Sequence, residues 1–277
     1  MTLTIGHINY ANCTPIFSAL LRKHVSDRYT FVKGVPSALN LRLRNGEIDL
    51  CPSSSIEYGK FPGNYYLLPQ LSISSIGPVR SVLLFSRVPI EELDGASIGL
   101  TTDSDTSVNL LRILLAKQFG FRTNLSRTGL PLRPALEVFS ALLLIGDAAL
   151  RESMAADGLH VYDLGEMWYR FTGLPFVFAL WLVTRRAVTG KRSEVAGLCA
   201  DLLDAKERAY SSYEEIAAEC PERQWMSREA LVEYWKVISY ELTPDHLSGL
   251  RTFYRFAAEM GIIPAAPEID LFSCDHR

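Results

Sequence analysis

The chain has 277 residues, which is enough for one large domain or for two lobes that each have a core. Apolar residues make up 48% and charged residues 21%, a composition that excludes a disordered or fibrous protein. The net charge of −3 gives the molecule no overall attraction for nucleic acid or for an anionic membrane, so an anionic ligand needs local hydrogen-bond donors.

The first ten residues, MTLTIGHINY, indicate a strand and carry neither the basic start nor the apolar run of a targeting segment. The longest apolar runs further along are too short to cross a bilayer. The five cysteines are scattered and form no CxxC pair, which favours neither a disulfide framework nor a zinc site. We therefore expect a reduced cytoplasmic protein with no metal, no nucleic-acid partner and no membrane partner. The oligomeric state is left open.

Short β-rich runs alternate with helical segments through about Arg185. Thr14-Pro15 is typical of a helix start, with the hydroxyl as N-cap and proline in the first turn. Such alternation favours βαβ units around a mostly parallel sheet. The first series predicts strands at 3–8, 30–33 and 48–52, helices from residue 14, at 36–44 and at 55–60, and extended runs at 65–75 and 79–86.

A second series starts after Pro89 and gives way to a helical segment after about Arg192. Its predicted strands are 97–101, 141–146, 161–164 and 176–183, and its predicted helices are 106–119, 147–155 and 165–171. The final segment predicts helices at 193–209, 213–219, 227–238 and 244–261.

The extended runs 79–86 and 176–183 bracket the second series, as two hinge strands between lobes do. We expect an α/β, two-lobed fold of the type 2 periplasmic-binding-protein kind with a helical C-terminal segment. Residues 1–86 and 187–277 form the first expected lobe, and residues 87–186 form the second. A ligand is expected in the cleft between them, near the carboxyl ends of the strands.

Hydroxyl side chains follow one predicted strand in each expected lobe, at 53–55 and at 101–107. Free N–H groups and hydroxyls at a helix start suit a carboxylate or phosphate. Simple N-capping is the alternative, since Asp103 and Asp105 compete with an anion and Ser54 with Glu57 fits a capping box. Facing each other across a cleft, the two segments suit a ligand with two negative groups.

Other candidates have simpler structural interpretations. The amides of Asn9 and Asn12 can hold a substrate hydroxyl or carboxylate, but asparagine is also a common turn residue. Ser81 has no histidine nearby and lies in no G-x-S-x-G motif, so a serine hydrolase is not indicated. Asp147 follows a predicted strand and is either a base or, more simply, an N-cap. Aromatic residues near the return hinge are mostly expected in the core, with one or two lining the cleft.

Seven strings, in order along residues 5–185, resemble the chorismate dehydratase family of the futalosine route to menaquinone. The string near the return hinge is the most specific of them. The strings are IGHINYANCTP (5–15), GVPSALN (34–40), GEIDLCPSSSIEY (46–58), GPVRSVLLFS (77–86), TTDSDTSVNLLRILL (101–115), LLIGDAAL (143–150) and DLGEMWYRFTGLPFVFALW (163–181).

The resemblance implies a binding-protein-like fold, no metal or organic cofactor, and one small dianionic substrate, chorismate. The implied reaction removes water to give 3-[(1-carboxyvinyl)oxy]benzoate. The family's loop asparagine falls on Asn12 and its hinge serine on Ser81, which we expect to be catalytic. Its other hydroxyls fall on Thr106 and Ser107 and on Ser54. The expected substrate-binding residues are Ser54, Ser55, Thr106, Ser107 and Asp147.

In the implied mechanism Thr106 and Ser107 hold one carboxylate, Ser54 and Ser81 hold the other or orient the ring, and Asn12 bonds the leaving hydroxyl. The base is left open between a substrate carboxylate and a pocket carboxylate. Two residues depart from the family pattern. Arg80 is expected to point away from Ser81 because strand neighbours alternate, and Asp105 brings a negative charge close to the expected anion site.

Two other functions stay open. A non-catalytic cytoplasmic protein that binds a small anion has the same fold. A 1,4-dihydroxy-6-naphthoate synthase-like enzyme of the same pathway needs a base in the cleft, typically a histidine. His7 and His160 are both more simply explained as structural residues.

Overall fold

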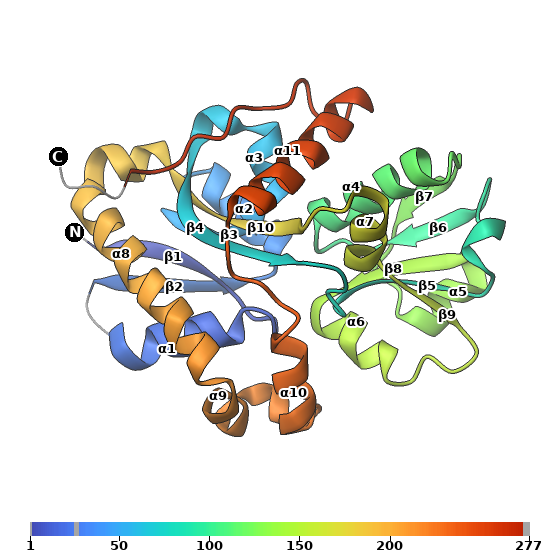
Figure 1. Ribbon diagram of the computed structural model, residues 1–277, viewed down its shortest axis with the longest axis horizontal. Coiled ribbons are helices and arrows are strands. Elements are labelled where there is room, and N and C mark those ends of the chain that lie inside the picture. Colours follow the sequence, from blue (N-terminus) through green and yellow to red (C-terminus); the bar gives the residue numbers. More distant parts are fainter. Residues whose placement is uncertain (1, 25–27, 274–277) are drawn as a thin grey trace.

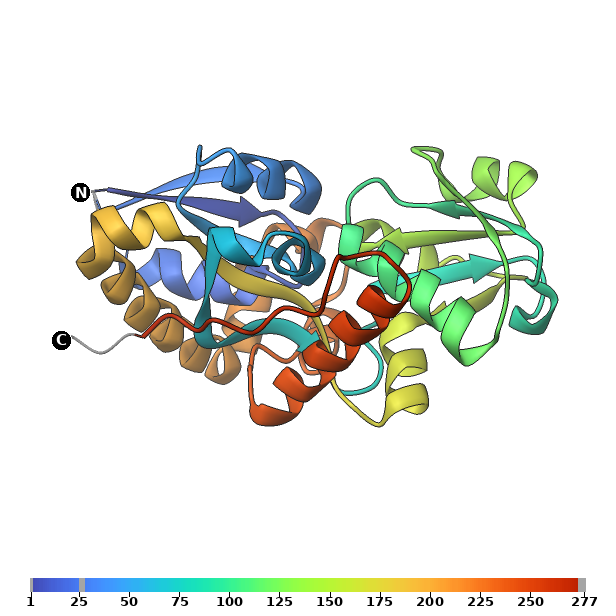
Figure 2. The same ribbon diagram turned by 90° about the horizontal axis from the view of Figure 1, so that it is seen from above.

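The structure is a computed structural model that describes residues 2–24 and 28–273. Two lobes lie side by side, and each is built on a five-stranded sheet covered by helices (Figures 1 and 2). The expected two-lobed binding-protein-like architecture is confirmed. Both ends of the described chain belong to the same lobe (Figure 1).

The first sheet has the order β2-β1-β3-β10-β4 and the second the order β7-β6-β8-β5-β9. The strands of the first are β1 (Leu3–Ile8), β2 (Tyr29–Gly34), β3 (Leu50–Ser54), β4 (Tyr65–Ser75) and β10 (Phe176–Thr184). Those of the second are β5 (Val82–Ser86), β6 (Ser97–Leu100), β7 (Asn124–Arg127), β8 (Ala141–Ile145) and β9 (His160–Asp163).

Helices cover both sheets and form the C-terminal segment. They are α1 (Thr14–His24), α2 (Pro36–Arg44), α3 (Ser55–Lys60), α4 (Asp105–Ile113), α5 (Leu132–Val138), α6 (Gly146–Ser153), α7 (Leu164–Thr172), α8 (Arg185–Ser211), α9 (Tyr213–Glu219), α10 (Arg228–Trp235) and α11 (Pro244–Glu259). Short turns of helix are η1 (Pro62–Asn64), η2 (Ile90–Glu92), η3 (Leu114–Gln118), which is a π-helix, and η4 (Pro221–Gln224).

The two sheets repeat one topology. Three strands run parallel, the fourth runs antiparallel to them, and the fifth pairs antiparallel with the fourth. The antiparallel strands are β10 and β5, which follow the two crossings between the lobes. The expected mostly parallel sheet is therefore confirmed for four of the five strands in each lobe, and each crossing returns one strand against the direction of its neighbours.

Sheet membership also moves the lobe boundaries from their expected positions. The strand β5 pairs in the second sheet and β10 pairs in the first. The chain therefore crosses at residues 76–81 and again at 173–175, ahead of the boundaries expected after residues 86 and 186. A strand was expected to span each hinge, but each crossing is an irregular segment followed by a strand.

Asp163 fastens the outward crossing to the start of α7. Its carboxylate accepts backbone hydrogen bonds from Val79 at 3.0 Å and Arg80 at 2.6 Å, and it also caps α7 through Gly165 and Glu166. Arg80 adopts a positive φ of 61°, so it lies in a left-handed turn and not on a strand. The side chain of Arg80 is exposed, as expected, although this turn, and not strand alternation, directs it outward.

The return crossing is held by α7 and α11. Trp168 donates its indole N–H to the carbonyl of Pro175 at 3.3 Å. Gly249 of α11 lies so close to this carbonyl that an added Cβ would stand 2.0 Å from the Pro175 oxygen. Helix α11 can therefore pack this closely against the Pro175 carbonyl only because residue 249 is glycine.

Most elements match the prediction within a few residues, and the exceptions are informative. The prediction missed β7 and α5, which have exposed or weakly apolar sequences. Helix α8 begins earlier than expected but has non-helical angles at Lys191, just before the predicted start at residue 193. The Thr14 hydroxyl, expected as a cap, donates to Glu222 at 2.6 Å. None of the helices within residues 2–24 and 28–273 is both long and apolar enough to cross a bilayer.

We predict that Gly249→Ala lowers the free energy of unfolding by about 1–3 kcal/mol, because the new methyl group overlaps the Pro175 carbonyl. Chemical denaturation measures this. Gly197→Ala is the matched control, since Gly197 also lies in a helix but has nothing within 4 Å of an added Cβ. The control should be neutral or stabilising by about 0.5–1 kcal/mol. Equal stability of the two variants would contradict the close packing.

Candidate functional site

A cavity of about 50 Å³ lies between the two lobes. This volume is well below the roughly 300–1,000 Å³ of typical small-molecule sites, so a ligand of that class would have to part the lobes. Ile8, Ser54 and Ile145 are the last residues of parallel strands β1, β3 and β8, and all three line it. Val82, the first residue of antiparallel β5, also lines it. The expected location at the carboxyl ends of the strands is therefore where the cavity lies.

Helix starts surround this cavity. Asn12 and Cys13 lead into α1, Pro36 opens α2, Ser104 precedes α4, and Gly146 opens α6, and all of these residues line the space. The N-terminal end of a helix carries a partial positive charge and unsatisfied N–H groups. Four helices of eight or more residues therefore direct their positive ends toward one volume.

Among the described residues that line the cavity, none carries a charge at neutral pH. The polar lining consists of Tyr10, Asn12, Cys13, Ser54, Ser81, Ser104 and Ser107. An anion in this space meets hydroxyl, amide and helix-end donors and no lysine or arginine side chain. Such a site favours negative charge through preorganised dipoles.

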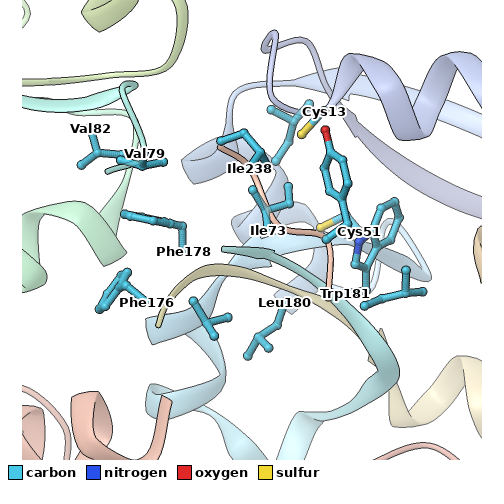
Figure 3. Close-up of a cluster of buried hydrophobic side chains, with 14 of the residues drawn as sticks. Cys13, Cys51, Ile73, Val79, Val82, Phe176, Phe178, Leu180, Trp181 and Ile238 are labelled. Atoms are coloured by element: carbon cyan, nitrogen blue, oxygen red, sulfur yellow. The ribbon is translucent and has the colours of Figure 1, made fainter. Parts of the chain in front are cut away.

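The apolar wall of the cavity comes from both lobes. Phe178, at the start of β10, lies between Val79 and Val82 on one side and Ile73 on the other (Figure 3). Of the aromatic residues near the return hinge, Phe178 lines the cavity, whereas Trp168, Phe176 and Trp181 are buried in the core. This wall suits the flat, apolar faces of a ring.

Ser54 is available to a ligand because it does not cap α3. It occupies the N-cap position, yet its side chain makes no capping hydrogen bond. Glu57, the expected partner in a capping box, turns away and binds Arg44 at 2.7 Å and Tyr65 at 2.9 Å. The capping box is therefore wrong, since the long-range ion pair takes the Glu57 carboxylate.

The four hydroxyl residues expected around the helix starts divide into two pairs. Ser54 and Ser107 line the cavity, but Thr106 and Ser55 do not. The Thr106 hydroxyl accepts from the backbone N–H of Ile56 at 3.1 Å and lies 3.3 Å from the Ser55 hydroxyl. Thr106 and Ser55 therefore join the two lobes beside the cavity, and their expected direct contact with a ligand stays a prediction.

Ser104, which the sequence analysis did not single out, caps α4 by accepting from the N–H of Ser107 at 3.3 Å. The hydroxyls of Ser104 and Ser107 lie 3.2 Å apart, and both residues line the cavity. A segment rich in Ser, Thr and Asp offers several candidate caps, and only the three-dimensional structure assigns that role to Ser104.

Asn12 carries an unsatisfied acceptor. Its Oδ1 is buried and has no hydrogen-bond partner among the described residues. An unpaired buried amide oxygen costs about 1–3 kcal/mol. A hydroxyl or other donor on a ligand in the adjoining cavity would remove this cost. Asn9, by contrast, lines a separate surface hollow with His7 and Lys33.

Ser81 lies at the inner end of the outward crossing and is 1% exposed. Its hydroxyl accepts from the phenol of Tyr234 at 2.8 Å and has only a long contact of 3.4 Å to the Val79 carbonyl for its own hydrogen. Burial raises the pKa of Tyr234, which keeps this phenol protonated. Because Tyr234 supplies one hydrogen, the Ser81 hydrogen can point toward a ligand.

Asp147 and Asp105 do not belong to the described cavity lining. Asp147 accepts from the backbone N–H of Ala11 at 2.9 Å, and burial raises its pKa. It supports the loop that carries Asn12, and it does not line the cavity as expected for substrate binding. Asp105 binds Lys60 at 2.8 Å and also binds Arg127, so its charge is neutralised outside the cavity.

The thiol and phenol in the lining are poor bases. Burial raises the pKa of the Cys13 thiol, and burial together with Asp103 raises the pKa of the Tyr10 phenol. Both groups therefore stay protonated near neutral pH. Across residues 2–24 and 28–273, no three His, Cys, Asp or Glu side chains are grouped in a way that would hold a metal ion.

A sequence model of the family described as menaquinone biosynthesis matches residues 3–259. The chain belongs to this menaquinone-biosynthesis family. The match agrees with the resemblance carried by the seven strings of the sequence. A family member, the chorismate dehydratase of Thermus thermophilus, is 32% identical over 280 residues, covering 95% of this chain and 96% of that protein.

Solved structures similar to this menaquinone-biosynthesis family member share its fold. A protein from Archaeoglobus fulgidus has a TM-score of 0.76 at 19% identity, covering 95% of this chain and 98% of that one. The periplasmic aliphatic sulphonate binding protein of Escherichia coli has a TM-score of 0.67 at 15% identity, covering 100% of this chain and 95% of that one. At these identities the likeness shows the two-lobed fold alone.

We predict that His7 makes this family member sensitive to acid. Burial and the nearby Lys33 lower the pKa of His7 from 6.5 to about 4, and its ring stacks on Phe17 at 3.9 Å. The unfolded chain therefore takes up a proton near pH 6.5 while the folded protein does not, so stability falls as the pH drops from 6.5 toward 4. The loss should be about 1–3 kcal/mol after allowance for partial solvent screening.

Denaturant unfolding near neutral pH and at the acidic end of this window tests the assignment. His7→Gln should lose less stability on acidification than the unmutated protein, whereas His160→Gln, at an exposed position on β9, should behave like the unmutated protein. Equal acid losses in all three proteins would contradict a role for His7.

Proposed function

We propose that this protein is a chorismate dehydratase, which converts chorismate to 3-[(1-carboxyvinyl)oxy]benzoate and water. The observation that carries the proposal is a cavity without charged side chains, ringed by helix starts and bordered by the unpartnered Oδ1 of Asn12. The similarity to the Thermus thermophilus chorismate dehydratase over nearly the whole chain supports the same activity.

The two carboxylates of chorismate would meet donors from opposite lobes. Ser104, Ser107 and the start of α4 suit one carboxylate, and Ser54 with Ser81 suits the other. A helix start contributes about 0.3–1 kcal/mol toward a nearby anion and up to ~2 kcal/mol in partly buried sites. Several such ends together offset part of the desolvation cost without a cationic side chain.

Asn12 would accept a hydrogen bond from the ring hydroxyl that leaves. This contact satisfies the buried Oδ1 and fixes the C–O bond relative to the ring. The apolar wall around Phe178 would hold the face of the ring. The proposed position of the reacting edge is thus next to the α1 end of the cavity.

The reaction also has to remove a proton from the ring. The C–H bond at the ether-bearing ring carbon breaks, its electron pair enters the ring, the C–OH bond breaks, and the hydroxide leaves as water with that proton. No carboxylate or imidazole belongs to the described lining, and the Cys13 and Tyr10 groups stay protonated. We therefore assign the base to a carboxylate of the substrate itself, held by the serines at the right distance.

The alternatives differ in their chemistry. The naphthoate-releasing sister enzyme needs a base in the cleft, and no histidine belongs to the described lining. A non-catalytic anion-binding protein would hold chorismate without converting it. Incubation of purified protein with chorismate, followed by chromatography for the aromatic enolpyruvyl ether, distinguishes these outcomes. Binding of unchanged chorismate would overturn the proposed activity.

We predict that Asn12→Ala and Ser81→Ala each lower turnover by about 100-fold, because each removes a preorganised polar contact to the reacting molecule. Ser86→Ala is the matched control. Ser86 is a fully buried serine on the neighbouring strand β5, but its hydroxyl binds the Val88 carbonyl at 2.7 Å, away from the cavity. The control should retain the turnover of the unmutated enzyme. Near-normal rates in both test variants would remove the assigned roles.

A further inference from the structure

Three aromatic side chains from one short stretch of the C-terminal segment reach the two parts of the chain that carry Asn12 and Ser81. Tyr234 and Trp235 end helix α10, and Tyr240 follows it closely. Their exposed fractions are 2%, 0% and 0%, so their polar ends are removed from solvent. Each polar end has a specific partner beside the cavity.

The three acceptors belong to two segments, the loop before α1 and the outward crossing. The Tyr234 phenol donates to the Ser81 hydroxyl at 2.8 Å. The Trp235 indole donates to the Ala11 carbonyl at 2.7 Å, and the Tyr240 phenol donates to the Asn12 carbonyl at 2.8 Å. Two donors thus hold the loop before α1, and the third holds the crossing that contains Ser81.

We propose that this stretch of the C-terminal segment positions the catalytic groups, with Tyr240 and Trp235 setting the Asn12 loop and Tyr234 setting the Ser81 hydroxyl. The expected effect on catalysis rests on the proposed function. None of the three residues belongs to the described cavity lining, so they act through Asn12 and Ser81 and are positioning residues.

The stretch is itself anchored to the sheet that leads into the outward crossing. Ser239 and Ser74 of β4 exchange backbone hydrogen bonds at 2.8 Å, and the N–H of Ser72 donates to the Tyr240 carbonyl at 2.9 Å. The Tyr240 N–H donates in turn to the Tyr210 phenol at 2.9 Å. Tyr240 therefore stands on a strand-like extension of the first sheet, and Tyr234 and Trp235 lie at the end of α10 just before it.

The Asn12 loop is held through its backbone, because its amide oxygen has no partner among the described residues. The backbone of the preceding residue is held from both sides, since Ala11 donates its N–H to Asp147 of the second lobe and gives its carbonyl to Trp235. Packing alone would be served by phenylalanine. The three polar ends, all directed at this loop and at Ser81, indicate a requirement for orientation.

The first test removes single hydroxyl groups. Tyr240→Phe and Tyr234→Phe should each lower kcat/KM on the order of tenfold, mainly through kcat, with the same amount of folded protein. Tyr58→Phe is the matched control, because the Tyr58 phenol is equally buried and donates to the Glu268 carbonyl at 2.7 Å, away from the cavity. It should lower the unfolding temperature without lowering kcat.

A double-mutant cycle separates positioning from general stability. In a Ser81→Ala background, Tyr234→Phe should have less than about a twofold further effect, because its target is already absent. Multiplication of the two effects, or full activity of both single phenylalanine variants, would overturn the proposal.

Amide hydrogen exchange supplies a measurement that does not depend on activity. In Tyr240→Phe, exchange over residues 9–17 should be faster than in the unmutated protein, whereas Tyr58→Phe should leave it unchanged. If the unmutated protein leaves chorismate unchanged, the proposed function fails, and this exchange experiment then decides the positioning role by itself. Unchanged exchange in Tyr240→Phe would contradict it.

Discussion

Under the proposed function the site depends on one electrostatic constraint: a doubly charged ligand must be held in a cavity whose described lining carries no charged side chain. The fold meets it because parallel strands in both lobes end at the same place and the following helices start there. Their N-terminal ends point toward the cavity and supply fixed partial charges. Because these charges belong to the backbone, no side chain has to be reordered when a ligand binds.

The same constraint explains why charged residues near the site are paired outside it. Asp105 would oppose an anion at the start of α4, but Lys60 and Arg127 take its charge. Asp147 would oppose an anion at the start of α6, but it accepts a hydrogen bond from the Ala11 backbone N–H. Both interactions also join the lobes, as do Thr106 with Ile56 and the Tyr10 phenol with Asp103 at 3.2 Å. The contacts that engage these two carboxylates are therefore also contacts that join the lobes.

Local sequence patterns predicted most elements and the location of the cleft, since strand alternation and helix starts are local features. Asn12, Ser54, Ser81 and Ser107 were expected at the site and line the cavity. The departures at the site involve partners that are not neighbours in the sequence. Ser55 and Thr106 face each other across the lobes, and Glu57 pairs with Arg44 instead of capping α3. No spacing in the sequence indicates that Tyr234 meets Ser81, because 153 positions separate them.

Under the proposed function, a binding-protein-like fold becomes an enzyme through a small addition. Helix starts and serines are sufficient to bind a dianion, and they favour negative charge whether or not it reacts. The chemical step needs something that distinguishes the reacting molecule from the bound one. In the proposed function that element is Asn12, an acceptor with no partner among the described residues, whose carbonyl and preceding residue are fixed by Tyr240, Trp235 and Asp147. If a carboxylate of the substrate acts as the base, the protein has only to orient that carboxylate toward the ring proton. Rigid support from the C-terminal segment then matters more than any ionisable group in the cavity.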